Sequence, residues 1–542
     1  MNLNIIHRIP FSSFYSATEP LAAYAANDPF MTQRLGGREL LLRRIADWPV
    51  ARPNAAVATA IEEFNQQMGA DALALEQARK LRDPRTVAVA TGQQIGLLTG
   101  PFYALLKALT AVSTARWITQ QTGRPAVALF WCLDEDHDYN EINQLSIPAA
   151  TGLERLSLGS TPPELTAVGR HKPGANGTAL LQALTELHRG RRAVVETEEL
   201  LRATWSEEYD LLQWFARCLL ALTRGAGLIV AALSLAQIKA SLRPLARASV
   251  LAGPEIVASA NRAGEELARS GFRQQVRKSA TSLPFFLLSP DGLRIPLRKD
   301  AVHYAGAGRT WTVAELLEEF DVNPPAFSPG VLLNPVAFAY AVPTVAYVGG
   351  PGEAAYHAQL PDIFRALFVR QPTFIPRAGA TIVNSVAERL LGRFGLTPQQ
   401  TLDQDLDRTA IAYQERSAGM PNDQEWDALV SECIAPLARL EALAQTVDAT
   451  LSGAIDKTRG NMIEHIGALR QRFSKAVLRR EQAAAGDAAR LRAWLAPNGG
   501  PQERSLSPFA FLFDEGLGFV MGLSDVIEPV PTDHLLLSLK PS

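Results

Sequence analysis

The sequence predicts an α/β protein with a parallel sheet at its core and an antiparallel pair of long helices in its C-terminal part. Two observations predict this fold class. Residues 86–143 show the pattern of a strand, a helix and a second strand, and such a crossover makes neighbouring strands parallel. Residues 422–495 are rich in helix-forming residues and repeat apolar side chains at helical spacing.

The boundaries of the strand–helix–strand unit are visible in the sequence. Residues 86–91 are an apolar, β-branched run, which is typical of a buried strand. After a glycine-rich turn, Pro101 is expected at the first position of the helix, where its missing N–H costs nothing. Gly123 ends the helix, and residues 126–133 are the second strand. One stripe of the helix is expected to face the sheet: Phe102, Leu105, Leu106, Leu109 and Val112.

Polar residues follow both strands. The first strand ends in TGQQ at 91–94, and the second is followed by DEDHD at 134–138. The carboxyl ends of parallel strands meet at one edge of the sheet, where ligands bind in open α/β folds. Backbone N–H groups, amides and a helix N-terminus suit an anion or a phosphate. Carboxylates and an imidazole suit proton transfer or a cation, so the sequence predicts a functional site at this edge.

A third segment repeats this arrangement. Residues 344–348 predict a strand, and GGPGE at 349–353 predicts a turn into a helix. Glu353 lies in the first helical turn, where the helix dipole favours a carboxylate. Residues 373–376 predict a further strand, and Arg377 at its carboxyl end suits a carboxylate or a phosphate.

The C-terminal helical region carries an apolar seam. On its second helix, apolar residues follow one another at steps of seven, four, three, four and four. Mixed steps of three and four residues are typical of a coiled coil. Because two helices alone cannot bury such a seam, we expect a homodimer through this region. The seam comprises Leu437, Leu440 and Leu443 on the first helix, and Ile455, Met462, Ile466, Leu469, Phe473 and Val477 on the second.

Composition narrows the class of protein. The 542 residues carry a formal net charge of −2, which gives no electrostatic reason to expect a nucleic-acid partner. Three widely spaced cysteines predict a reducing compartment rather than a disulfide framework or a zinc ribbon. No signal peptide pattern is present, and no apolar run reaches the roughly 18 residues of a membrane helix. We therefore expect a cytoplasmic protein with no membrane partner.

Several common catalytic motifs are absent from the sequence. The glycine turns do not follow the GxGxxG spacing and there is no P-loop, which disfavours a dehydrogenase or a P-loop kinase. Neither a GxSxG elbow nor a CxxC pair is present. The run at 134–138 leaves open a metal-dependent hydrolase that uses Asp136 and His137, although adjacent loop residues cannot all point inward.

Several stretches together resemble one protein family. TGQQIGLLTGP at 91–101, FWCLDEDHDYNEIN at 130–143, YVGGPGEAAYHAQL at 347–360, the helical segment near 422–495 and PNGGPQERSLSPF at 497–509 are similar to the bacillithiol-biosynthesis cysteine-adding enzymes. The resemblance implies a ligase that adds L-cysteine to glucosaminyl-malate, the last step of bacillithiol synthesis. It also implies a Rossmann-like core related to nucleotidyltransferases and a coiled-coil dimerisation domain. The cofactor stays open, with ATP or another nucleotide as the candidate activator of the carboxylate.

The motifs of this family assign candidate site residues, to which the strand pattern adds Arg377. The resemblance implies no metal ligand. The candidate catalytic residues come from the acidic run and are Asp136, His137 and Asp138. The candidate substrate- or nucleotide-binding residues are Thr91, Gly92, Gln93, Gln94, Gly96, Gly100, Pro101, Gly350, Pro351, Gly352, Glu353 and Arg377.

The element pattern and the resemblance together divide the chain into segments. We expect an N-terminal helical segment packed on the core, a core assembled from three separate stretches, two insertions, a helical coiled coil and a C-terminal return to the core. The N-terminal segment is 1–85. The core comprises 86–143, 204–234 and 341–421, and the insertions are 144–203 and 235–340. The coiled coil is 422–495, and the C-terminal return is 496–542.

Two departures from the family pattern bear on function. Asn334 stands where the family commonly has an arginine, and residues 337–339 (Ala-Phe-Ala) replace acidic or amide residues. Residues 232–236 likewise lack the usual aspartates. These changes affect positions expected to contact substrate and leave the exact thiol product open. They also motivate a second alternative, a coiled-coil scaffold that has lost catalysis.

Overall fold

A five-stranded parallel sheet forms the centre of the molecule, with strand order β13-β12-β2-β3-β6. The computed structural model describes residues 2–50, 54–149, 152–159, 161–300, 302–403, 423–448 and 451–540. The parallel sheet and its Rossmann-like crossover confirm the predicted fold class. Thr91 pairs with both Phe130 and Val348, so the polar ends of three strands meet at one edge. The strands are β2 (Val87–Gln94), β3 (Ala126–Leu133), β6 (Leu228–Ala232), β12 (Thr344–Gly349) and β13 (Thr373–Pro376).

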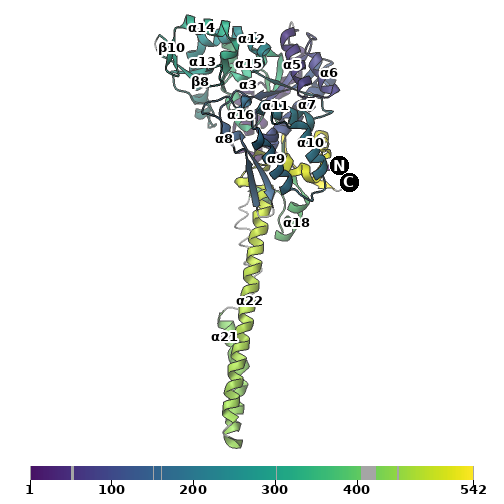
Figure 1. Cartoon of the computed structure of the whole chain (residues 1–542), viewed down its shortest axis with the longest axis vertical. Coiled ribbons are helices and arrows are strands. Elements are labelled where there is room, and N and C mark those ends of the chain that lie inside the picture. Colours follow the sequence, from purple (N-terminus) through teal and green to yellow (C-terminus); the bar gives the residue numbers. More distant parts are fainter. Residues whose placement is uncertain are drawn as a thin grey trace. The chain divides into compact units, whose positions relative to one another are not determined.

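Helices surround this sheet because its strands are apolar on both faces (Figure 1). On one face, Phe130 packs against Phe215 of α11, with ring centroids 5.8 Å apart. The edge strand β6 is closed by α5, where the buried Asn65 amide donates to the Val230 carbonyl at 2.7 Å and accepts from its N–H at 3.0 Å. This pairing satisfies backbone groups that an edge strand would otherwise leave open. The helices concerned are α5 (Ala55–Gln67), α7 (Phe102–Thr122) and α11 (Leu211–Leu222).

Helix α7 is buried over most of its first half, not only along the expected stripe. The reason is the C-terminal segment, which packs against α7 on the side away from the sheet. Phe102 lies 5.5 Å from Phe511 and 5.9 Å from Phe519, measured between ring centroids. Pro101 precedes α7 as its N-cap rather than occupying the first helical position, while Gly123 ends the helix as expected. The returning helices are α23 (Gln502–Ser505), α24 (Phe509–Glu515) and α25 (Gly518–Val526).

A three-stranded sheet joins distant parts of the chain, in the order β1-β15-β14. β1 (Asn2–Pro10) pairs antiparallel with β15 (Asp533–Lys540), and β15 pairs in parallel with β14 (Gly379–Val383). The expectation of helices from residue 1 was therefore wrong for Asn2–Pro10, because this strand depends on a partner more than 500 residues away. Helices do fill the rest of that segment: α1 (Phe11–Phe14), α2 (Pro20–Ala25), α3 (Pro29–Leu35), the 3₁₀ helix η1 (Arg38–Leu40), α4 (Leu41–Ala46), α5 and α6 (Ala72–Lys80).

Two insertions lie between the strands of the parallel sheet. The second contains an antiparallel sheet of order β10-β9-β8-β7-β11, in which β7 and β8 form a hairpin. The elements between β2 and β6 are η2 (Leu97–Thr99), α8 (Tyr139–Ile142), β4 (Gln144–Ala149), β5 (Gly152–Ser157), η3 (Val168–Arg170), α9 (Ala175–Leu187) and α10 (Val194–Thr204). Those from β6 onward are α12 (Ala236–Ser241), α13 (Arg243–Arg269), β7 (Ser282–Leu288), β8 (Arg294–Lys299), β9 (Tyr304–Gly306), β10 (Arg309–Trp311), α14 (Val313–Val322), η4 (Pro324–Ala326), β11 (Phe327–Pro329), α15 (Asn334–Ala341), α16 (Pro351–His357) and α17 (Pro361–Ala366).

The chain divides into two compact units. The first comprises Met1–Pro148, Leu153–Asn384 and Gly500–Ser542, and the second Ala149–Gly152 and Ser385–Gly499. Residues 385–403, which we expected in the core, therefore group with the helical unit, and 404–421 lie outside the described residues. The helices of the second unit are α18 (Ser385–Phe394), α19 (Gln400–Asp403), α21 (Asp423–Val447), α22 (Leu451–Leu495) and η5 (Pro497–Gly499).

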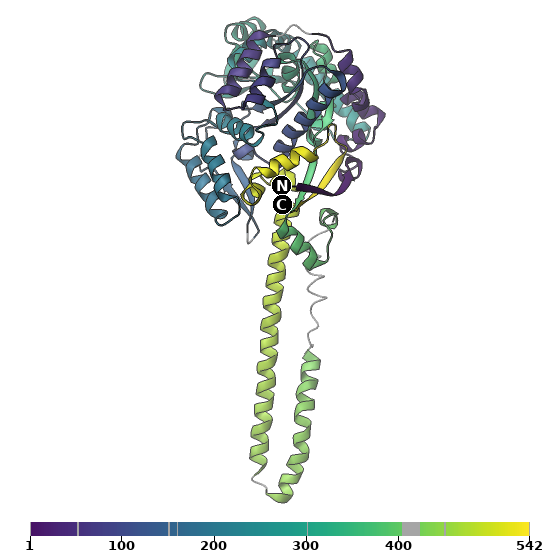
Figure 2. The same ribbon diagram turned by 90° about the vertical axis from the view of Figure 1, so that its right-hand side faces the viewer.

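Helices α21 and α22 run antiparallel as a hairpin, which confirms the coiled-coil prediction (Figure 2). Trp426 packs edge-on against Phe473 with ring centroids 5.8 Å apart, and Arg459 forms an ion pair with Glu441 at 2.5 Å. Much of the predicted apolar seam nevertheless remains exposed in the single chain, including Leu440, Leu443, Leu469 and Phe473. The side chain of Val477 lies outside the described residues. Dimerisation stays a prediction.

The helices of the described ranges include none that is both long and apolar enough to span a membrane.

Candidate functional site

A cavity of about 340 Å³ opens at the carboxyl edge of the parallel sheet. It lies where the sequence predicted a site, at the ends of β2, β12 and β13. The lining residues combine amides, carboxylates, cations and tyrosines. They are Gly92, Gln93, Gln94, Tyr103, Lys107, Leu133, Asp136, Gln275, Val276, Val331, Asn334, Phe338, Tyr347, Gly350, Pro351, Gly352, Glu353, Tyr356, Arg377 and Arg504.

The end of β2 forms one wall of this cavity. Thr91 is buried and its hydroxyl donates to the Val348 carbonyl at 2.8 Å, which ties β2 to β12. Gly92 lies so close to β3 that a Cβ atom would sit 3.1 Å from the Trp131 carbonyl oxygen. A glycine is needed at position 92 for this close approach. Its carbonyl oxygen and the Gln93 side chain are both acceptors for Lys107.

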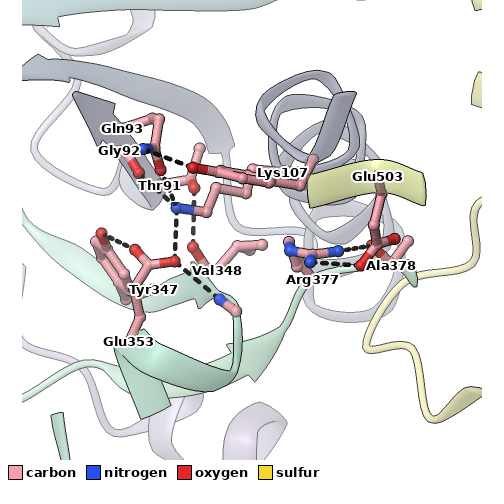
Figure 3. Close-up of polar contacts among 12 residues, drawn as sticks. Thr91, Gly92, Gln93, Lys107, Tyr347, Val348, Glu353, Arg377, Ala378 and Glu503 are labelled. Carbon is pink, nitrogen blue, oxygen red and sulfur yellow. Dashed lines mark hydrogen bonds and ion pairs between the residues drawn. The ribbon is translucent and has the colours of Figure 1, made fainter. Parts of the chain in front are cut away.

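Lys107 of α7 is a buried cation that links the end of β2 to Glu353 of α16 (Figure 3). Its Nζ donates to the Gly92 carbonyl and to Gln93 Oε1, both at 2.9 Å, and forms an ion pair with Glu353 Oε2 at 2.5 Å. An ammonium group has three hydrogens, so these three acceptors satisfy it. Burial lowers the pKa of the Lys107 amine, and Glu353 opposes that shift.

Glu353 is placed by the start of α16. Its Oε2 accepts from the Gly350 N–H at 2.8 Å in a capping box, and its Oε1 accepts from the Tyr347 hydroxyl at 2.9 Å. Burial raises the pKa of Tyr347 and Tyr356 well above the usual value for tyrosine, and Glu353 adds to both shifts. Both phenols therefore keep their hydrogens at neutral pH. The glycine turn and helix start predicted at 349–353 thus position a carboxylate at the cavity wall.

Arg377 lies at the end of β13, as the strand pattern predicted, but its guanidinium group is already paired in part with the Glu503 carboxylate of the protein. Its Nη2 donates to Glu503 Oε1 at 2.5 Å and its Nη1 to the Ala378 carbonyl at 2.8 Å (Figure 3). Both side chains are almost fully buried. Burial opposes the charge of Arg377, but Glu503 outweighs it and raises the pKa of the guanidinium. Glu503 also accepts from the Ala380 N–H at 2.7 Å.

The acidic run after β3 does not act as one cluster, because its carboxylates face different cations. Glu135 pairs with Lys239 at 2.6 Å, and Asp136 pairs with Arg294 of β8 at 2.5 Å. Asp134 is buried, and burial together with Glu135 raises the pKa of its carboxyl group to about 7. Of these residues, only Asp136 lines the cavity.

His137 and Asp138 lie outside the cavity lining. The imidazole of His137 packs edge-on to Phe286 at 6.2 Å between ring centroids, and the Asp138 side chain is 60% exposed. Within the ranges that the structure describes, no group of three or more His, Cys, Asp or Glu residues is arranged to hold a metal ion. The metal-dependent hydrolase therefore gains no support from the arrangement of this run.

The structure brings together nine of the predicted site residues and leaves six outside the cavity lining. The six are Thr91, Gly96, Gly100, Pro101, His137 and Asp138. Gly96 and Gly100 shape the turn instead: a Cβ atom on Gly96 would sit 3.0 Å from the Gly100 Cα, and Gly100 has a φ of +72°. The nine are Gly92, Gln93, Gln94, Asp136, Gly350, Pro351, Gly352, Glu353 and Arg377.

Sequence reasoning missed the residues that α7 and the more distant segments contribute. Lys107 carried a signal, because it is a lone cation in the apolar run FYALLKAL. Arg504 lies in the family-like stretch 497–509 but was not singled out there, and Tyr103 had no signal, since its neighbours become visible only after folding. Asn334, named above as a departure from the family pattern, lines the cavity together with Phe338.

Comparisons with known proteins match both parts of the chain to one family. Residues 39–378 match the family described as "Bacillithiol biosynthesis BshC, N-terminal Rossmann-like domain", and residues 380–539 match its "C-terminal coiled-coil domain". A relative from Symbiobacterium thermophilum is 30% identical over 493 residues, which cover 88% of each chain. One from Solibacter usitatus is 31% identical over 467 residues, covering 84% of this chain and 86% of the relative. Both carry the name "Putative cysteine ligase BshC".

Proposed function

Since the chain belongs to the BshC family of bacillithiol biosynthesis, we propose that it is a ligase that joins L-cysteine to glucosaminyl-malate. The product of this step is bacillithiol: an amide bond forms between the cysteine carboxyl carbon and the amine of glucosaminyl-malate, the carboxyl C–O bond breaks, and the net by-product is water. We place the reaction in the cytoplasm and in a homodimer that forms through the helical hairpin. Neither the metal-dependent hydrolase nor the scaffold is favoured by these comparisons.

The observation that carries the proposal is the pairing of opposite charges in one cavity. Amide formation joins an amine to a carboxyl group, so the site must hold a substrate cation and a substrate anion. Glu353 and Asp136 supply carboxylates, and Arg377 and Arg504 supply guanidinium groups, and all four line the same cavity. Both motif turns, 92–94 and 350–353, line that cavity. This distribution suits two substrates that each carry an amine and a carboxylate.

We propose a direct role for one member of the acidic run. An amine attacks only after losing a proton, and a carboxylate at the cavity wall can accept it. Asp136 lines the cavity and is oriented by Arg294, which also donates to the Ser328 hydroxyl at 3.1 Å and the Pro329 carbonyl at 2.8 Å. Asp138 is exposed to solvent and serves as its matched control.

The test uses a bacterium that makes bacillithiol and whose own gene of this family has been deleted. Expression of the wild-type chain is expected to restore bacillithiol and to consume accumulated glucosaminyl-malate, both measured by mass spectrometry. Asp136→Asn is expected to abolish this restoration, whereas Asp138→Asn retains it. A wild-type chain that is present at normal level but leaves the thiol pool unchanged contradicts the proposal.

A further inference from the structure

The orientation of the Gln93 amide is set by Lys107. An ammonium group has hydrogen-bond donors and no acceptor, so the side-chain atom facing Lys107 Nζ at 2.9 Å must be the amide oxygen. The amide nitrogen therefore points to the other side, where it donates to the Tyr103 hydroxyl oxygen at 3.0 Å. One buried cation thus determines which end of Gln93 meets Tyr103.

This contact determines the role of the Tyr103 hydroxyl in turn. Its oxygen accepts from Gln93, so its own hydrogen must point elsewhere, and a phenol has one hydrogen to donate. Across the described residues, the structure gives this hydroxyl no other hydrogen-bond partner, and Tyr103 lines the cavity. Burial raises the pKa of Tyr103, and Glu353 adds to the shift, so the hydrogen is retained at neutral pH. The cavity therefore contains a hydroxyl whose hydrogen is available for donation.

Two further side chains of the cavity also offer hydrogen-bond donors to a ligand. The Gln94 Nε2 atom is buried without a hydrogen-bond partner, and Arg504 has no ion pair with any acidic residue of the described ranges. The carboxylates of the cavity, Glu353 and Asp136, are already engaged by Lys107 and Arg294. Tyr103, Gln94 and Arg504 thus present donors, and a carboxylate, which only accepts, is complementary to them.

We propose that Tyr103 is a substrate-binding residue whose hydroxyl donates a hydrogen bond to a carboxylate oxygen of the substrate, with Gln93 as the positioning residue that keeps it a donor. This role rests on the function proposed above, in which both substrates carry a carboxylate. Two substrates offer such a carboxylate: the malate part of glucosaminyl-malate, and L-cysteine.

The experiment titrates L-malate and L-cysteine separately into the purified full-length chain by calorimetry. Tyr103→Phe is expected to weaken binding of one of the two by about tenfold or more, because a hydrogen bond to a charged group is lost. The carboxylate whose affinity falls identifies the source. Circular dichroism checks that each variant is folded.

A double-mutant cycle separates this role from simple packing. In Gln93→Glu, one oxygen still accepts from Lys107 and the second accepts the Tyr103 hydrogen, which withdraws the donor from the cavity. Tyr103→Phe is then expected to cost less than about twofold in that background. Gln275→Glu adds the same charge to the lining of the same cavity at an exposed residue that makes no hydrogen bond to Tyr103 or Gln93, so there Tyr103→Phe keeps its full, roughly tenfold effect.

The outcomes distinguish this inference from the proposed function. Equal binding by wild type and Tyr103→Phe, equal effects in the two glutamate backgrounds, or no binding of either carboxylate by the wild type overturns the inference. A chain that binds a carboxylate through Tyr103 but does not restore bacillithiol overturns the proposed function and leaves the inference standing.

Discussion

The sheet-edge cavity and the helical hairpin place their side chains in opposite ways. Around the cavity, charged groups are buried: the Lys107 and Arg377 side chains are 2% and 3% exposed. On the hairpin, apolar residues face solvent: Leu443 is 59% exposed and Val447 is 77% exposed. Each region thus reverses the usual distribution, in which charges lie outside and apolar groups inside.

The difference leads to a prediction of which region depends on another molecule for its structure. The buried charges find partners within the chain, so the cavity wall is organised before any substrate binds. Among the described residues, no layer covers the exposed seam of the hairpin, and we infer that a second copy provides it. The predictions below test the two halves of this comparison.

The largest effect is expected from the buried ion pair at the cavity. Glu503→Gln leaves the Arg377 guanidinium buried without its carboxylate, which is expected to lower the free energy of unfolding by about 3–5 kcal/mol. The matched change on the hairpin is Glu441→Gln, whose ion pair with Arg459 is partly exposed and should contribute at most about 1 kcal/mol. Urea denaturation of both variants measures the two values. Equal destabilisation of the two variants would contradict the expected difference between the buried and the exposed ion pair.

The next effect concerns activity. Lys107→Met removes the donor shared by Gly92, Gln93 and Glu353, so the Glu353 carboxylate loses its cation and Gln93 is free to turn. We expect restoration of bacillithiol to fall by about a hundredfold, a loss of the size seen when a preorganised group is removed from an active site. Lys457→Met, on the exposed surface of α22, is the control and should retain wild-type thiol levels.

The hairpin half of the comparison is tested by assembly. Burying one leucine side chain contributes about 1.5–3 kcal/mol, so Leu469→Glu is expected to weaken a dimer by roughly tenfold or more. Sedimentation velocity over a range of protein concentrations measures the change. Trp426 and Phe473 are left intact so that the hairpin itself still forms. A wild-type chain that sediments as a monomer at micromolar concentration rules out the dimer.

The smallest effect is a pH dependence of the core. His357 is buried against Tyr347, and burial together with Lys107 lowers the pKa of its imidazole to about 3. Its contribution to stability is therefore fully present above the ordinary histidine pKa of about 6.5, and is lost as the pH falls toward 3. Between pH 6.5 and 5.5 the wild type should lose about 1 kcal/mol more than His357→Leu. Denaturation curves that shift equally with pH in both proteins would contradict this.

Local pattern was enough to predict the elements that carry the site. The strand–glycine turn–helix pattern at 86–101 and again at 344–353 located two walls of the cavity, because parallel strands bring their carboxyl ends to one edge. The acidic run was located correctly but interpreted too broadly. Neighbouring residues of a loop point in different directions, so Asp136 reaches the cavity while His137 and Asp138 do not.

The remaining parts of the site depend on contacts that no local pattern encodes. Arg294 comes from the second insertion, and Glu503 and Arg504 come from the C-terminal return, more than 120 residues after Arg377. Tyr103 looked like an ordinary helix residue because its importance comes from Gln93 and Lys107, which fix its hydrogen bond. The strand Asn2–Pro10 was missed for the same reason, since its partner is β15.

The pairing of β1 with β15 also affects how the protein is made (Figure 2). A ribosome adds about 5–20 residues per second, so on the order of half a minute or more separates the synthesis of the two strands. Throughout that interval β1 has an open edge on the nascent chain, with Ile5 and Ile6 beside it. β14 also lacks its partner strand for a time, because the whole helical hairpin is translated before β15 emerges. We therefore expect the yield of native protein to depend on translation speed and on chaperones that shield this edge.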